Sequence, residues 1–413
     1  MTTPTPRDLS VKDKFSLSKF LIKWEMVLIY IFILVNVVLI IGNPQTYNTT
    51  MIQWTIQEIM AKAFMVFGIV LILILGDIDV SIASTLAVSA MCMGLTANMG
   101  LPSYVVVLSG LIAGAICGAI NGFLVAKLKL SSVIVTISTS LLFRGIVKIV
   151  MDNVEGKKLS TYPNWFTTAA SGYIFGIPIS LIVFLLFGIF FCVLLHKSKF
   201  GRKLYMMGNN YTASEYSGIN ASNTKLIVFM IAGIMAAVCS IFYIGHAGNQ
   251  MNSAIAKGYE LDVIAIAALG GVLPSGGKGK MYGPMIATFI MAFLDRMLSL
   301  LEVEENSKKV VTGIILIIAV IIPFFNKDFF DSVKLKLVYH NNKSLSALSM
   351  MHKEEMKGLK QQISSINAQT TLSRSEKQAK INKLQREIKN KETVYKEKYA
   401  AIFTEVKNRK AVK

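Results

Sequence analysis

Long apolar runs alternate with short polar segments from residue 24 to about residue 325. A bilayer core of about 30 Å needs roughly 20 apolar residues per helix. On this basis the pattern predicts ten spans: 25–41, 57–75, 80–98, 104–126, 131–150, 178–196, 225–244, 260–273, 282–300 and 309–325. Two of them, 80–98 and 260–273, are broken by Gly or Ser or are short for a full crossing. We therefore expect an all-α, polytopic transmembrane helical bundle of about ten spans.

The segments at the two ends of the chain are polar. Residues 1–23 are basic, and no small-x-small cleavage site follows the first apolar run, so we expect a retained first helix rather than a signal peptide. This predicts a cytoplasmic N-terminal segment (1–23), a transmembrane domain (24–330) and a cytoplasmic helical tail (338–413).

The tail has an apolar repeat of its own. Met356, Leu359 and Ile363 step by three and four, and the same spacing returns after an interruption at 369–373. Such spacing is typical of a coiled coil and predicts two helices folded back as an antiparallel pair. The pattern leaves open whether the pair is a solvated appendage or contacts a cytoplasmic partner.

Basic residues in the loops predict the orientation. Lys127 with Lys129, the cluster at 197–203, and Lys278 with Lys280 fall in alternate loops, on the same side as both termini. Positive loops face the cytoplasm, so ten crossings place both termini there.

Composition changes the meaning of the charge. The chain has 413 residues, 53% hydrophobic and only 16% charged, with a formal net charge of +19. From residue 338 onward 17 Lys and Arg stand against 7 Glu. The charge therefore indicates membrane topology and attraction to anionic lipid headgroups, not nucleic acid. The four cysteines lie in apolar segments without metal-ligand spacing and are expected to pack as small hydrophobes.

The segment Gly76-Asp77-Ile78-Asp79-Val80-Ser81 places two carboxylates directly after an apolar helix. Ionisable residues inside a membrane are costly and indicate function. One interpretation is a broken helix whose backbone lines a cavity. The other is a capping turn in which Asp79 or Ser81 accepts from free N–H groups of the next helix. The two interpretations are compatible.

A second polar segment, Gly258-Tyr259-Glu260-Leu261-Asp262, precedes the glycine-rich loop 274–280. This loop imitates a phosphate-binding loop, but Gly277 stands where that motif needs lysine, and Lys278 is followed by Gly279 instead of a hydroxyl residue. We therefore expect no nucleotide site in this chain.

The cytoplasmic stretch 200–222 predicts a short helix from about Thr212 to Ser217, capped by Asn210 and ended by Gly218. Such a helix has no core of its own, so it lies on lipid headgroups or enters a groove of a partner. No catalytic constellation or metal-ligand pattern accompanies it, and we do not expect an enzyme.

Several segments resemble, in the same order across about 60–330, the ribose-type sugar permeases of binding-protein-dependent ABC importers. They are Gly76–Ser81, similar to G-G-I-D-L-S; Gly122–Lys129, similar to G-x-L-V-A-K-L-K; Phe143-Arg144-Gly145; Gly208–Asn220; and Gly258–Asp262 with Leu269–Gly271 and Gly276–Gly279.

The resemblance implies a multi-pass protein of the bacterial inner (plasma) membrane that moves a ribose-like monosaccharide. It implies a cytoplasmic ATP-binding cassette subunit that hydrolyses ATP, a second permease copy or paralogue, and an extracytoplasmic sugar-binding protein. Its implied coupling loop comprises Gly208, Asn209, Ala213, Glu215, Ser217, Gly218 and Asn220. It implies a solute route near the broken helix at 76–81. We expect the substrate pathway to comprise Gly76, Asp77, Asp79, Ser81, Asn121, Tyr259, Glu260 and Asp262, the last three stabilising the second half near the outer face.

This sequence departs from the family pattern at three positions. Asp77 stands for a usual second glycine, Ala83 for a common glycine and Ser131 for a frequent proline. Asp77 adds a charge beside the implied pathway, so a nucleoside, a polyol or an autoinducer-like solute stays open. From another class, a carrier driven by a proton or sodium gradient would use the intramembrane carboxylates.

Overall fold

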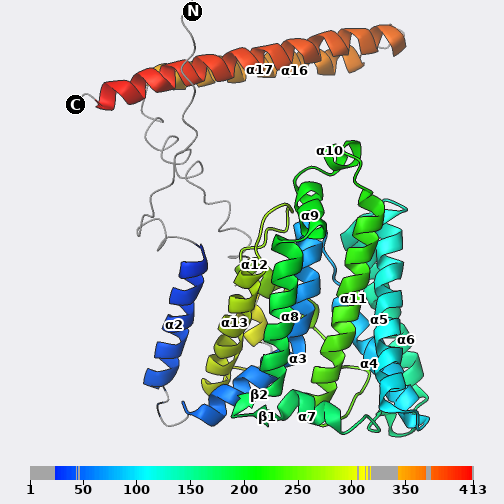
Figure 1. Ribbon diagram of the computed structural model, residues 1–413. Coiled ribbons are helices and arrows are strands. Elements are labelled where there is room, and N and C mark those ends of the chain that lie inside the picture. The colour runs from blue at the N-terminus through cyan, green and yellow to red at the C-terminus, as the bar shows by residue number, and fades with distance from the viewer. Residues whose placement is uncertain are drawn as a thin grey trace, which may run out of the picture. The chain divides into compact units, whose positions relative to one another are not determined.

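The computed structural model describes residues 24–42, 44, 47–304, 307–311, 313–314, 317, 343–368 and 374–411. The chain divides into two compact units, Met1–Pro323 and Phe324–Lys413. The first unit is a bundle of helices and the second is a pair of helices (Figure 1).

The centre of the bundle is α3 (Thr49–Ile74), in which every residue from Ala63 to Ile74 is buried. A helix that is apolar on all sides belongs in the interior of a bundle. Around it pack α8 (Ile179–His196), α11 (Ala221–His246), α12 (Tyr259–Leu269) and α13 (Tyr282–Leu300). This half of α3 therefore faces other helices and not lipid.

Close backbone contact joins α11 to α5 (Ser103–Ala126). On α5 a glycine recurs at every fourth residue from Gly110 to Gly122. A Cβ atom on Gly118 would lie 2.9 Å from the Cα atom of Met230, and one on Gly114 would collide with the carbonyl oxygen of Gly233. Small residues at this spacing let membrane helices approach closely.

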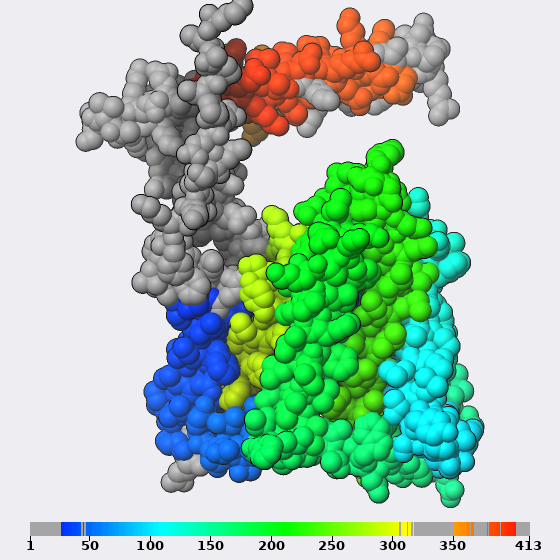
Figure 2. Space-filling model, in the orientation of Figure 1, coloured from blue at the N-terminus to red at the C-terminus, as the bar shows by residue number. Residues whose placement is uncertain are grey.

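The outer faces of the bundle are apolar. On α6 (Ser132–Asp152) and α8, large side chains such as Leu141, Ile149 and Leu186 are more than half exposed. Figure 2 shows side chains of α8 and α11 covering one face of the bundle. Six described helices (α3, α5, α6, α8, α11 and α13) are long and apolar enough to cross a membrane.

The all-α prediction is confirmed, and most helix positions agree with it. The structure adds α2 (Trp24–Gly42) and α4 (Ile82–Asn98) where spans were predicted, while α3 begins at Thr49 instead of residue 57. The helices at the two spans predicted to be broken or short, 80–98 and 260–273, are α4 with 17 residues and α12 with 11. The predicted span 309–325 lies mostly outside the described residues, so the count of ten stays a prediction.

The loop 152–177 contains small elements: η1 (Glu155–Lys157), α7 (Trp165–Ser171) and the hairpin of β1 (Tyr173–Ile174) with β2 (Ile177–Pro178). The strands pair antiparallel, Ile174 opposite Ile177. The Gln57 side-chain amide donates to the Ser171 carbonyl at 3.0 Å, so this loop is fastened to α3.

In the second unit, α16 (Lys343–Ala368) packs along α17 (Arg374–Ala411). The His352 ring stacks on Tyr395 at 3.9 Å, and Glu355 pairs with Lys391 at 3.4 Å. From His352 to Glu355 the residue number rises on α16, while that of the contacting residue on α17 falls from 395 to 391. The helices therefore run antiparallel, as predicted. Coiled-coil packing itself stays a prediction, and the interruption at 369–373 lies outside the described residues.

Candidate functional site

The predicted helix break lies between α3 and α4. The backbone leaves the helix at Gly76, whose φ is +80°, and re-enters it at Ile82. The Ile78 N–H donates to the Ser132 hydroxyl at 3.3 Å, and the Val80 N–H donates to the Thr136 hydroxyl at 3.1 Å. Non-helical backbone at membrane depth needs such partners, and α6 supplies them.

Inside the break a buried chain of hydrogen bonds connects three predicted site residues. The Asp79 carboxylate accepts from the Ser81 N–H at 2.7 Å and from the Ser81 hydroxyl at 2.6 Å. Asn121 on α5 donates to that hydroxyl at 2.7 Å. The predicted cap is present only in part. The Asp79 carboxylate accepts from the N–H of Ser81, the residue that precedes α4, but the Ser81 side chain accepts from no N–H of α4.

Asp77 forms an ion pair that the sequence did not predict. Its carboxylate lies 2.7 Å from the Lys225 ammonium on α11, and both side chains are nearly buried. The same ammonium lies 5.3 Å from the ring centroid of Tyr211, at the start of α10 (Tyr211–Tyr216). Lys225 therefore links the helix break to the short helix of the 200–222 stretch.

Three backbone segments meet tightly beside the break. The Gly277 N–H donates to the Ile74 carbonyl at 2.8 Å, satisfying an orphan acceptor at the end of α3. A Cβ on Gly276 would lie 2.9 Å from the Cα atom of Gly76, and one on Gly208 would collide with the Ile74 carbonyl. We call the contact of Gly76, Gly208 and the 274–279 loop the glycine junction. It explains the loop's glycines by packing, in line with the sequence argument against a nucleotide site.

The Gly208 segment of the junction is the end of α9 (Lys199–Asn209). The sequence analysis did not predict this helix. The Tyr205 hydroxyl donates to the Gly279 carbonyl at 2.6 Å. Burial raises the pKa of Tyr205 to about 12, so the hydroxyl stays protonated and remains a donor. The Asn209 side-chain amide lies 3.5 Å from the Gly277 carbonyl. These bonds hold α9 against the loop.

The short helix α10 agrees closely with its prediction. The Asn210 side chain caps it by accepting from the Ala213 N–H at 2.9 Å, and Gly218 follows in the left-handed conformation. Glu215, Tyr216 and Ser217 are exposed, Tyr216 by 89%. α10 thus presents a small polar and aromatic surface beyond the helix bundle (Figure 1).

The chain approaches α12 through the loop 247–258. Arg144 on α6 donates to the carbonyl oxygens of Ile255 and Ala256, the latter at 3.0 Å. Gly258 then adopts a φ of +92° and α12 starts at Tyr259. The arginine therefore fixes the position at which this half-length helix begins.

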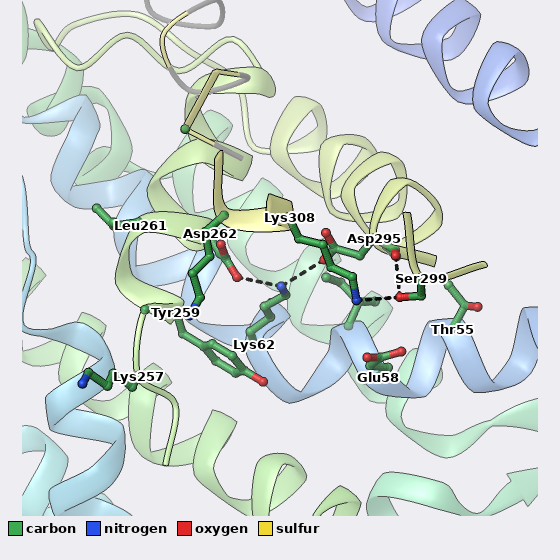
Figure 3. Close-up of a pocket in the computed structure, with 15 residues that line it drawn as sticks. Thr55, Glu58, Lys62, Lys257, Tyr259, Leu261, Asp262, Asp295, Ser299 and Lys308 are labelled. Atoms are coloured by element: carbon green, nitrogen blue, oxygen red, sulfur yellow. Dashed lines mark hydrogen bonds and ion pairs between the residues drawn. The ribbon is translucent and has the colours of Figure 1, made fainter. Parts of the chain in front are cut away.

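A pocket of about 250 Å³ lies between α3, α12 and α13. Figure 3 shows the Lys62 ammonium between two carboxylates. It lies 2.8 Å from Asp262 and 3.2 Å from Asp295, and 5.4 Å from the Tyr259 ring centroid. Lys308 donates to the Ser299 hydroxyl in the same pocket at 2.9 Å. We call Lys62, Asp262 and Asp295 the charge triad.

The structure divides the predicted pathway residues into two groups. Asp77, Asp79, Ser81 and Asn121 gather at the break, whereas Tyr259 and Asp262 lie at the pocket. Lys62 and Ile74, the last residue of α3 before the break, are 12 residues apart, or about 18 Å at the rise of an α-helix.

Lys62, Lys225 and Asp295 were missed by the sequence analysis. The signal was present, since each is an ionisable residue within an apolar run.

Comparison with known proteins agrees with this architecture. The profile of the family described as branched-chain amino acid transport system / permease component matches residues 51–320. The ribose import permease protein RbsC of Bacillus subtilis is 32% identical over 292 residues, 71% of this chain and 90% of the relative. RbsC of Haemophilus influenzae is 28% identical over 75% of this chain and 95% of its own length.

The autoinducer 2 import system permease protein LsrD of Escherichia coli is 26% identical over 72% of this chain and 91% of the relative. No solved structure gives a significant match. The family match spans both the break and the pocket and covers well over half of the sequence. The chain therefore belongs to the branched-chain amino acid transport system / permease component family.

Proposed function

We propose that this protein is the membrane-spanning permease subunit of an ATP-driven importer for a sugar. One observation carries the proposal: similarity to ribose import permeases extends along 90% and 95% of the length of two such relatives. The similarity is to whole permeases and not to an isolated helix pair. It therefore supports the same overall task for residues of the first unit.

The proposed topology has ten crossings within 24–330, with 1–23 and the helical tail 338–413 both in the cytoplasm of a bacterium. The alternating basic loops support this orientation. The heptad-like spacing in the tail supports coiled-coil packing of α16 against α17. The bilayer is the inner, or plasma, membrane.

In this proposal ATP is hydrolysed by a separate cytoplasmic subunit and the permease catalyses no reaction. The coupling surface is the segment from Gly208 and Asn209 through Ala213, Glu215, Ser217 and Gly218 to Asn220. Support comes from the exposure of α10 and from its link through Lys225 to the helix break. A movement of α10 would reach Asp77 through Lys225.

The solute would be a ribose-like monosaccharide delivered by an external binding protein. The pathway includes the break, with Gly76, Asp77, Asp79, Ser81 and Asn121, and the start of α12, with Tyr259, Glu260 and Asp262. A second permease, identical or paralogous, completes the membrane unit. The break between α3 and α4 and the half-length α12 resemble the discontinuous helices that line transport routes.

Two alternative cargoes keep the same machinery: an amino acid, from the family description, and an autoinducer, from the LsrD relatives. A nucleoside or polyol is a further variant. A gradient-driven carrier is less well supported, because Asp77 and Asp262 are each neutralised by a lysine. A carboxylate that binds and releases a driving cation would need to be free of such a partner in part of the cycle.

The test is purification of the tagged protein from detergent-solubilised membranes of its host, with identification of the associated proteins. We expect a stoichiometric ATPase with a phosphate-binding loop, released by substitutions at Glu215 and Gly218. A pure permease that transports solute without any ATPase would remove the importer and favour the gradient-driven carrier.

A further inference from the structure

We infer that the pocket between α3, α12 and α13 binds a neutral, polyhydroxylated solute, and that the charge triad at its wall discriminates against charged solutes. This inference rests on the proposed function, because it assigns the solute to particular atoms. It adds Lys62, Asp295 and Ser299 to the residues of the proposed pathway.

The charge triad is partly buried and borders the pocket. The side chains of Lys62, Asp262 and Asp295 are 12%, 22% and 30% exposed. Lys62 engages one oxygen, Oδ2, of each carboxylate, so each carboxylate keeps a second oxygen with accepting capacity. The Ser299 hydroxyl lies in the same wall, where it donates to the Asp295 carbonyl at 2.8 Å and accepts from Lys308 at 2.9 Å. Its donor is therefore used, and it offers a solute one remaining acceptor position. The hydroxyl groups of a solute can donate to these acceptors.

The partly buried charges are balanced. Lys62 and Lys308 carry two positive charges, and Asp262 and Asp295 carry two negative charges. The other charged lining residues (Glu58, Lys257 and Lys309) are exposed. A neutral solute leaves the inner balance intact, whereas a charged one adds a poorly solvated charge without an available partner. An uncompensated buried charge is strongly unfavourable.

The remaining walls suit the carbon side of such a solute. Ile59, Leu261 and Ala292 line the pocket beside the charge triad. Sites that combine apolar walls with a few placed polar groups are typical of small-molecule binding. A branched aliphatic side chain would match only these walls and would donate no hydrogen bond to the second carboxylate oxygens of the charge triad.

The pocket can be probed with a cysteine introduced at the exposed position Ser299. We would label S299C in the full-length protein in membranes with a negatively charged methanethiosulfonate reagent, and subtract the labelling of the unsubstituted protein. We expect D-ribose, D-galactose or ribitol to slow labelling about tenfold at saturation. L-leucine, glucosamine and ribose 5-phosphate should not protect. Absence of protection by all three neutral compounds, or equal protection by the charged ones, would overturn the inference.

The discrimination against charged solutes is tested by changing the net charge of the partly buried lining residues in both directions. K62M leaves an excess negative charge and should shift protection of S299C toward glucosamine, whereas D295N leaves an excess positive charge and should shift it toward ribose 5-phosphate. The double variant K62M/D295N is neutral again and should return the preference to neutral compounds. K157M, at an exposed ion pair with Asp152, is the matched control.

These outcomes separate a binding role from a structural one. If the charge triad only holds the helices together, the folded single variants keep the original order of preference, and the inference is wrong. The importer itself is tested by ATPase association. Unprotected S299C in a protein that retains its ATPase and imports a sugar would therefore reject this site and leave the proposed function standing.

Discussion

Asp77 and Lys225 form the most testable single contact near the break. Their charged atoms are 2.7 Å apart and their side chains are 12% and 14% exposed. Removing one partner of a buried pair leaves the other charge uncompensated, at a cost of about 3–5 kcal/mol. We expect D77N and K225M each to lower the apparent melting temperature in detergent and to reduce solute uptake per ATP hydrolysed.

The control for this prediction is the exposed pair of Asp152 and Lys157, whose loss should change stability by about 1 kcal/mol or less. The exchanged variant D77K/K225D restores opposite charges at the same two positions. We expect it to recover much of the coupling lost in K225M. Normal coupling in both single variants would contradict a link between the break and α10.

Gly208 provides a second residue-scale prediction, at the glycine junction. A methyl group there would collide with the Ile74 carbonyl and the Gly277 N–H. Because both are backbone atoms in a hydrogen bond, the clash cannot be relieved by a side-chain rotation, and overpacking typically costs about 1–3 kcal/mol. We expect G208A to be less stable than G145A, whose added Cβ meets nothing within 4 Å. Thermal unfolding of the two variants in the same detergent would decide; equal melting temperatures would refute the tight packing.

At the scale of elements, α10 carries the proposed contact with the ATPase. Tyr216 is 89% exposed on a helix of six residues, and exposed aromatic side chains are frequent anchors of interfaces. We expect Y216A to weaken capture of the ATPase at least tenfold. E215A should insert normally in the membrane while ATP hydrolysis is uncoupled from uptake.

K199M, on α9, is the comparison variant for this surface because Lys199 precedes the short helix and lies outside the segment proposed to bind. Co-purification at matched expression measures capture, and the ratio of ATP hydrolysed to solute transported measures coupling. Full capture by Y216A together with normal coupling by E215A would place the ATPase contact elsewhere.

The elements also show which features could be predicted from sequence. The lengths of the apolar runs predicted most helices. Asn210 and Gly218 predicted α10 to within one residue at each end, because helix caps act locally. α9 was missed since it is amphipathic and short, and its Tyr205 bond depends on residue 279, which is distant in the chain. The glycine spacing on α5 was readable in the sequence, whereas its partner helix, α11, was not. Likewise Lys62 could be noticed as an ionisable residue, but its pairing with Asp295 required the fold.

At the scale of the whole molecule, the chain combines an apolar bundle with a second unit that is strongly basic. From residue 338 onward the excess of Lys and Arg over Glu is ten. Each Lys or Arg near an anionic membrane surface contributes about 1 kcal/mol of attraction, which salt screens. Because the second unit is covalently connected to the bundle, it cannot diffuse away from the membrane. A part of this attraction is therefore enough to keep it on anionic lipid.

We therefore expect the tail to bind anionic lipid in the leaflet that faces it. In the full-length protein reconstituted at low salt, trypsin should cleave the tail several-fold more slowly in vesicles with about one third phosphatidylglycerol than in pure phosphatidylcholine. The difference should vanish at 0.5 M salt, where the Debye length falls below about 5 Å. A variant with six exposed tail lysines changed to glutamine (positions 353, 357, 380, 383, 396 and 398) should be cleaved at one rate in both lipids, after correction for the lost cleavage sites. Salt-insensitive protection that persists in neutral lipid would instead indicate that the tail is covered by protein, because such a contact does not depend on headgroup charge.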